Sequence, residues 1–141
     1  MFGAPSPFST TTDRSVTRAL VMTGMHFAGA IVHGAAHEHY EIPMEPWMKV
    51  YIVVVITIAP VVAGVLLWRG RLRLGAWLLL VSMAGSLLFG LAFHFLLLGP
   101  DHVSSVNMQG WGVTFQATAF LLAVTEALGM VAAVRVLRAM A

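Results

Sequence analysis

The stretch WMKVYIVVVITIAPVVAGVLLW, residues 47–68, carries Lys49 as its only charged residue. An α-helix needs about 20 predominantly apolar residues to cross the hydrocarbon core of a bilayer, so this stretch is long enough to do so. Three further stretches share its length and apolar character: Val16–Ala36, Gly75–Leu98 and Val113–Leu137. We therefore predict an all-α integral membrane protein with four transmembrane helices.

The composition points the same way. Of 141 residues, 59% are hydrophobic and 10% are charged, whereas soluble domains have about 45–50% and about 25%. The length fits one domain, with a flexible tail over residues 1–15 and a four-helix transmembrane domain over residues 16–138. The chain has no cysteine, which excludes disulfides, a thiolate zinc site and a cysteine nucleophile. No phosphate loop, nucleophile elbow or basic and aromatic stripe is present, so the expected partner is the lipid bilayer and not nucleic acid.

Basic residues set the predicted orientation. Seven of the eight fall on one side of the predicted membrane: Arg14, Arg18, Arg69, Arg71, Arg73, Arg135 and Arg138. The positive-inside rule makes that side cytoplasmic, and with it both termini. Because backbone polar groups must be paired within lipid, four alternating spans predict an up-and-down helix bundle, with a kink at Pro60. The predicted location is the cell inner membrane, with the opposite side facing the periplasm of a bacterium.

Histidines follow a polar stripe in the first span. At 100° per residue, His26, His33 and His37 share one narrow face, and His94 lies near the outer end of the third span. Imidazole and carboxyl groups facing lipid are costly, so these stripes are predicted to face the bundle interior. By depth, His33, His37 and His94 form an outer layer, and His26 forms an inner layer with Glu126 of the fourth span.

The outer layer has the composition of a metal site. Two imidazoles at i and i+4 can bind a metal from one helix face, and His94 with His102 or a carboxylate would complete a tetrahedral or tetragonal set. Copper, iron and zinc all fit, and Met44 and Met108 favour copper because a thioether suits Cu(I). Interface solvation could explain His37 and His39 but not the deeper His33 and His94. Secondary candidate ligands in the loops are His39, Glu41, Glu45 and Asp101.

Two alternatives remain open at this point. In the first, His94 and either His33 or His37 hold a haem b for electron transfer, a scheme that leaves four histidines unexplained. In the second, the chain is a small accessory subunit of a larger membrane complex, or a homo-oligomer, and the histidines serve that assembly. The metal-ion site uses more of the sequence and is preferred. Whether the chain is an enzyme is left open.

Glu126 is the only acidic residue predicted deep within a span. A carboxylate at mid-membrane costs several kcal/mol, so Glu126 is expected to stay protonated or to face His26 across the bundle. The alternative is a neutral Glu126 bonded to a backbone carbonyl or to Thr125 or Thr23. The predicted function is metal handling or redox chemistry at the outer histidines, with His26 and Glu126 as a proton or ion relay.

Overall fold

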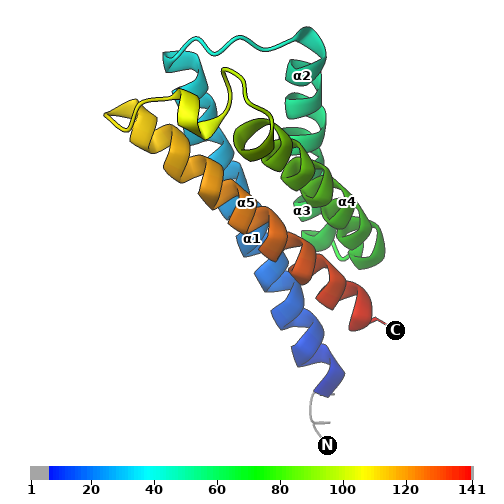
Figure 1. Ribbon diagram of the computed structural model, residues 1–141. Helices are drawn as coiled ribbons and strands as arrows, with labels where there is room; N and C mark the ends of the chain where they lie inside the picture. Colours follow the sequence, from blue (N-terminus) through cyan, green and yellow to red (C-terminus); the bar gives the residue numbers. More distant parts are fainter. Residues whose placement is uncertain (1–6, 141) are drawn as a thin grey trace, which may run out of the picture.

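A computed structural model of the protein describes residues 7–140, and that range contains helices and no strands (Figure 1). Four helical segments are long and apolar enough to cross a membrane: Thr12–His39, Pro46–Trp68, Leu72–Leu96 and Trp111–Arg138. The prediction of an all-helical fold with four such spans is confirmed. In chain order the elements are α1 (Pro7–His39), α2 (Pro46–Tyr51), the π-helix η1 (Ile52–Ile58), α3 (Ala59–Trp68), α4 (Leu72–Gly90), the π-helix η2 (Leu91–Leu96), the 3₁₀-helix η3 (Val103–Ser105) and α5 (Trp111–Arg138).

The first helix begins earlier than predicted. Residues 7–15, expected to belong to a flexible tail, are the first turns of α1, and residues 1–6 of that tail lie outside the described residues. Proline is favoured in the first turn of a helix, where its missing N–H would have no intrahelical partner, and Pro7 occupies that turn.

The four spans form a closed ring. α1 packs along α5, α5 along α4, α4 along α3, and α3 returns to α1. The start of α1, the 69–71 turn and the end of α5 lie at one end of the bundle, and the 40–45 and 97–110 loops lie at the other (Figure 1). We call these the arginine end and the histidine end. Their separation is that of an up-and-down bundle.

Small residues allow the helices to approach closely. A Cβ atom on Gly29 would lie 3.3 Å from Leu122 of α5, so α1 and α5 touch at this point. A Cβ atom on Gly75 would lie 2.9 Å from the backbone nitrogen of Leu67, which is too close for any other residue without movement of α3 or α4. Close approach of this kind is typical of helices packed within lipid.

Two apolar clusters lie above and below the polar interior. The cluster at the arginine end includes Leu67, Leu79, Met83 and Val136, all at most 1% exposed, and it fills that half of the bundle. The cluster at the histidine end is smaller: Ala36, Ile42, Val106 and Phe115, with Tyr40 and Val103 packed against it. Polar side chains of all four spans lie between the two.

Two π-helical segments interrupt the spans. A kink was predicted at Pro60; the structure has the π-helix η1 there, which ends two residues before that proline. Proline has no N–H, so Pro60 cannot pair with the carbonyl of Ile56 one turn earlier. The second segment, η2, carries His94 and ends the third span at Leu96, where the bond from the Leu97 amide to the Ala92 carbonyl spans five residues. Short π-segments recur at functional sites.

Candidate metal centre

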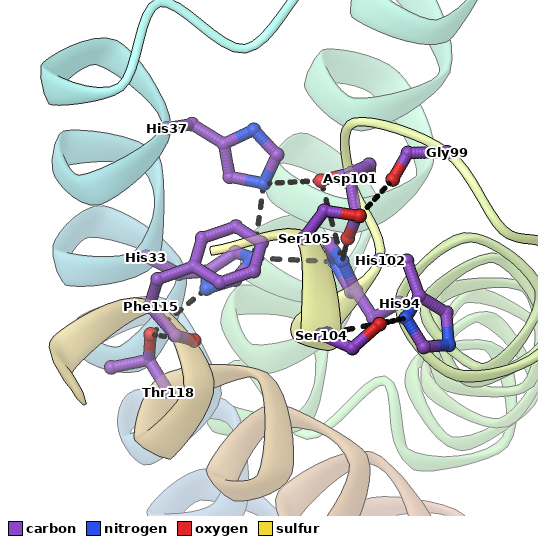
Figure 2. A network of polar contacts seen from close by, with 10 residues as sticks. All are labelled: His33, His37, His94, Gly99, Asp101, His102, Ser104, Ser105, Phe115 and Thr118. Carbon is purple, nitrogen blue, oxygen red and sulfur yellow. Dashed lines mark hydrogen bonds and ion pairs between the residues drawn. The ribbon is translucent and has the colours of Figure 1, made fainter. Parts of the chain in front are cut away.

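Three buried histidines from two spans converge near the histidine end (Figure 2). The Nε2 atom of His33 lies 3.2 Å from Nε2 of His37 and 3.2 Å from Nε2 of His94. The three potential ligand atoms all lie within 4.8 Å of one another, and each residue is at most 8% exposed. The side chains that the helical stripe and depth placed in the outer layer are therefore brought together into what we call the three-histidine cluster.

Hydrogen bonds on the far side of two rings fix which nitrogen faces the cluster. The hydroxyl of Thr118 donates to the carbonyl of Thr114 at 2.6 Å, so its oxygen is free to accept from Nδ1 of His33 at 2.8 Å. Nδ1 of His94 lies 2.9 Å from the backbone carbonyl of Asp101, which can only accept. Both Nδ1 atoms therefore carry a hydrogen, and in a neutral imidazole the Nε2 atom then carries the lone pair.

When both imidazoles are neutral, this arrangement places two lone pairs face to face. Nε2 of His33 and Nε2 of His94 are then both acceptors, and they lie 3.2 Å apart. Two ligands of a tetrahedral ion, each about 2.0–2.1 Å from the metal, lie about 3.3–3.4 Å apart. A metal ion bound by both nitrogens would replace their repulsion by coordination, and the separation already fits that geometry.

Asp101 adds a carboxylate to the cluster. Its Oδ1 atom lies 3.1 Å from Nε2 of His37 and 3.3 Å from Nδ1 of His94, and the residue is 7% exposed. Burial by itself raises the pKa of Asp101, but the bond to His94 and the nearby His37 and His33 outweigh it and hold the pKa below its usual value. The carboxylate is thus a negative charge beside three imidazole rings, a set of ligands that suits a divalent cation.

The loop that carries Asp101 is held in place from α5. The side-chain amide of Gln116 donates to the carbonyls of Val103 and Val106, at 2.9 and 3.0 Å. A Cβ atom on Gly112 would overlap the backbone oxygen of Asn107, so only glycine lets the loop pass this close to the helix. The 97–110 loop is therefore fixed over the histidine end of the bundle, and it places the Asp101 side chain beside His37 and His94.

Phe115 forms the wall of the cluster on the α5 side. Its ring lies 4.9 Å from that of His33, 5.1 Å from that of His37 and 5.5 Å from that of His94, measured between centroids, and it is fully buried. Sequence reasoning missed both Phe115 and Thr118. They stand three residues apart on α5, so they share one face of the helix, but an apolar residue and a threonine in a membrane span carry no signal of a ligand site.

The other predicted ligands lie outside the cluster. His102 turns to its own loop, where Nδ1 pairs with Ser104 and Nε2 lies 3.3 Å from the carbonyl of Phe95. His39 is exposed and stacks on Trp111 at 5.4 Å. Glu45 is exposed and precedes α2.

The backbone of Glu41 terminates α1, and its side chain does not reach the three-histidine cluster. It ends α1 with a φ of 47°, and the amides of Glu41 and Ile42 pair with the carbonyls of Glu38 and His37. This is the pattern of a Schellman motif, with Glu41 at the left-handed position and its side chain exposed. Of the two methionines that favoured copper, Met44 lines the cavity described below and Met108 is 68% exposed.

The cluster does not have the geometry of a haem pair. Two imidazole nitrogens on opposite faces of a haem iron lie about 4 Å apart with the porphyrin plane between them. The rings of His33 and His94 are in contact, with centroids 4.8 Å apart and planes at 83°, and His37 lies against both. A macrocycle between these rings would require the spans to separate.

The inner pair expected from solvation is also found. Nδ1 of His26 lies 3.6 Å from Oε1 of Glu126, and the side chains are 1% and 4% exposed. Nε2 of His26 donates to the carbonyl of Ile56 at 2.8 Å, the group that Pro60 cannot pair. His26 therefore presents the lone pair of Nδ1 to Glu126, within reach of a shared proton or one water molecule.

One cavity of about 360 Å³ connects the two layers. His33, His37, His94 and Asp101 line it at the histidine end, and Glu126 and Ser86 line it further in. Toward the arginine end, the apolar cluster around Leu79 and Met83 follows. In this conformation the polar interior opens away from the arginine end.

Replacing Thr118 with valine is expected to lower metal affinity about 10–100-fold, because His33 loses the acceptor that fixes its tautomer and ring orientation. Thr118→Ser keeps the hydroxyl and should retain most of the affinity. Thr114→Val, one turn away on α5, is the matched control. Competition titration with a chromogenic chelator measures all three, and equal affinities for Thr118→Val and Thr114→Val would contradict the assigned bond.

No family model, no curated protein and no solved structure matches this chain.

Proposed function

We propose that the chain is an integral membrane protein that binds one divalent transition metal ion through Nε2 of His33, His37 and His94. The observation that carries the proposal is the convergence of three imidazole nitrogens in a buried site, where Nε2 of His33 lies 3.2 Å from Nε2 of both His37 and His94. Structural polar contacts are arranged to pair donors with acceptors, whereas metal sites converge acceptors. Asp101 would hold His94 in place and leave the fourth coordination position exchangeable.

Imidazole and carboxylate ligands suit zinc, copper(II) or iron(II). A soft thioether is less central than the sequence suggested, because only Met44 lies beside the cavity. Three histidines with one exchangeable position is the ligand set of a site that acts on a bound molecule, whereas a closed set of four would serve structure. Metal-dependent chemistry or metal handling at the histidine end is the function we propose.

The pair of His26 and Glu126 fits a proton relay for that site. A group that is reduced, oxidised or hydrolysed at a metal exchanges protons, and the cavity extends from the cluster to Glu126. We propose that Glu126, which lines the cavity, exchanges the proton with the site and shares it with Nδ1 of His26. The apolar cluster at the arginine end would keep this exchange on the side of the histidine end.

Metal analysis of the purified protein tests the proposal. We expect about one zinc, copper or iron per chain by inductively coupled plasma mass spectrometry, and no Soret absorption. The variant with alanine at His33, His37 and His94 should contain less than about a tenth of that metal. A Soret band that disappears in this variant would show that the histidines bind haem and not a metal ion. A wild-type protein that is purified without metal and binds none of the three ions would contradict the proposed site.

The orientation proposed from the arginines has its own test. The chain has no cysteine, so single cysteines at Ser104 and Met140 report on opposite ends of the bundle. We expect a membrane-impermeant maleimide to label Ser104→Cys in intact cells and Met140→Cys only after permeabilisation. Labelling of Met140→Cys in intact cells would place the histidine end in the cytoplasm.

A further inference from the structure

The cavity has the size and lining of a small-molecule site. Its volume of about 360 Å³ falls within the range of about 300–1,000 Å³ that is usual for ligand pockets. Between its two polar ends the walls are apolar and come from all four spans, among them Phe27, Ile31, Ile52, Ile56, Phe89 and Leu122. A molecule that fills it must therefore be largely apolar.

The cavity reaches the side of the bundle as well as its mouth. Phe27 and Ile31 line it, yet they are 40% and 58% exposed and lie well inside the first span. α1 packs closely on α3 but makes little contact with η1, so the two spans diverge toward the histidine end (Figure 1). In a bilayer this opening faces acyl chains, and a ligand can enter from the lipid.

One hydroxyl within the cavity lacks a partner. Ser86 is 1% exposed and lines the cavity, and its Oγ atom makes no hydrogen bond. One turn earlier on α4, the hydroxyl of Ser82 bonds back to the carbonyl of Leu79 at 3.2 Å, which is the usual arrangement within a helix. A buried hydroxyl left unpaired costs free energy unless a bound molecule satisfies it.

We propose that this cavity binds a membrane-soluble quinone. One of its carbonyl oxygens would accept a hydrogen bond from the hydroxyl of Ser86. Glu126 also lines the cavity, and its carboxyl proton is shared with Nδ1 of His26, so Ser86 is the donor that the ligand meets. A quinone is neutral, lipophilic and bears only acceptors on its ring. A fatty-acid carboxylate would add a negative charge to a cavity that Asp101 already lines, and a phospholipid phosphate would find no lysine or arginine among the lining residues.

The proposal goes beyond metal binding and does not depend on it. Ser86 belongs to α4, is not among the grouped ligands and makes no hydrogen bond to them, so loss of the metal should leave the quinone's hydrogen bond intact. Metal content is measured in every variant below. A variant that loses quinone and keeps metal, or the reverse, separates the failure of one site from the failure of the other.

The test is calorimetric titration of a decyl-substituted benzoquinone into the full chain in phospholipid nanodiscs. Wild type should bind it saturably at one site. Ser86→Ala should weaken binding about threefold to tenfold, the value of one neutral hydrogen bond. Ser82→Ala, whose hydroxyl already has a partner, is the matched control and should bind as wild type.

A second pair of variants tests the cavity itself. Ala123 of α5 lines it, and Ala123→Phe should abolish binding by filling it; Ala127, one turn later, is exposed, so Ala127→Phe should have no effect. The proposal is overturned if wild type shows no saturable binding, if Ala123→Phe binds like Ala127→Phe, or if Ser86→Ala matches Ser82→Ala. The proposal would also be overturned if decylbenzene, which has no carbonyl oxygen, bound with the same affinity as the quinone.

Discussion

Alanine at His33 or at His94 is expected to lower the affinity for zinc or copper(II) at least about a hundredfold. Loss of a residue that only orients a metal ligand already costs about 10–100-fold, and these side chains are proposed as ligands themselves. Either substitution would also leave only two of the three imidazole ligands to chelate the metal ion. His37→Ala should weaken binding similarly, because its Nε2 atom lies 3.2 Å from that of His33.

Two histidines outside the cluster are the controls for this prediction. His39→Ala should leave affinity within about threefold, since His39 stacks on Trp111 at the surface. His102→Asn keeps an acceptor for the Ser104 amide, so it should preserve the loop and the affinity. Affinity would be measured by chelator competition at fixed pH. Unchanged affinity in all three cluster variants, or a larger loss in His102→Asn, would show that the metal binds elsewhere.

Phe115→Ala is expected to cost about 3 kcal/mol of unfolding free energy, the low end of the range for a buried phenylalanine, because lipid already supplies apolar surroundings to the unfolded spans. The ring is fully buried and lies against all three histidines. Its removal should leave a hollow into which the imidazoles tilt, so metal affinity should fall as well. Unfolding in mixed micelles, followed by circular dichroism, measures the stability.

Phe120→Ala is the matched control for Phe115→Ala. Phe120 lies on the same helix but is 58% exposed, so its loss should change the unfolding free energy by less than about 1 kcal/mol. Phe115→Leu should fall between the two because it refills part of the volume. If Phe115→Ala and Phe120→Ala were equally stable and bound metal equally well, Phe115 would not be the wall of the site.

Hydropathy was sufficient to predict the spans because it requires only length and composition. The four predicted segments and the four found differ by a few residues at their ends. The early start of α1 at Pro7 was missed because residues 7–15 are mostly polar and lack a helical repeat of apolar residues. The π-helices were missed for another reason: Pro60 signals a break in pairing, but whether the chain kinks or widens depends on the partner that pairs with Ile56, here His26.

For the site, helical phase predicted the members that share a face and a depth. His33 and His37 follow from their spacing, and His94 from its depth, because regular helices fix both. Loop residues could not be sorted in the same way. Asp101 and His102 are neighbours in the chain, yet one points into the cluster and the other away, as decided by the bonds of Gln116 to the 97–110 loop.

X-ray absorption spectroscopy of the metal-loaded protein tests the three-histidine site most directly. The extended fine structure should show three imidazole ligands at about 2.0–2.1 Å, with one further oxygen in the nearest shell. In the His94→Ala variant, loaded at high metal concentration, the imidazole count should fall to two. A wild-type spectrum with one imidazole or none, or one that is the same in the variant, would contradict the proposed metal centre.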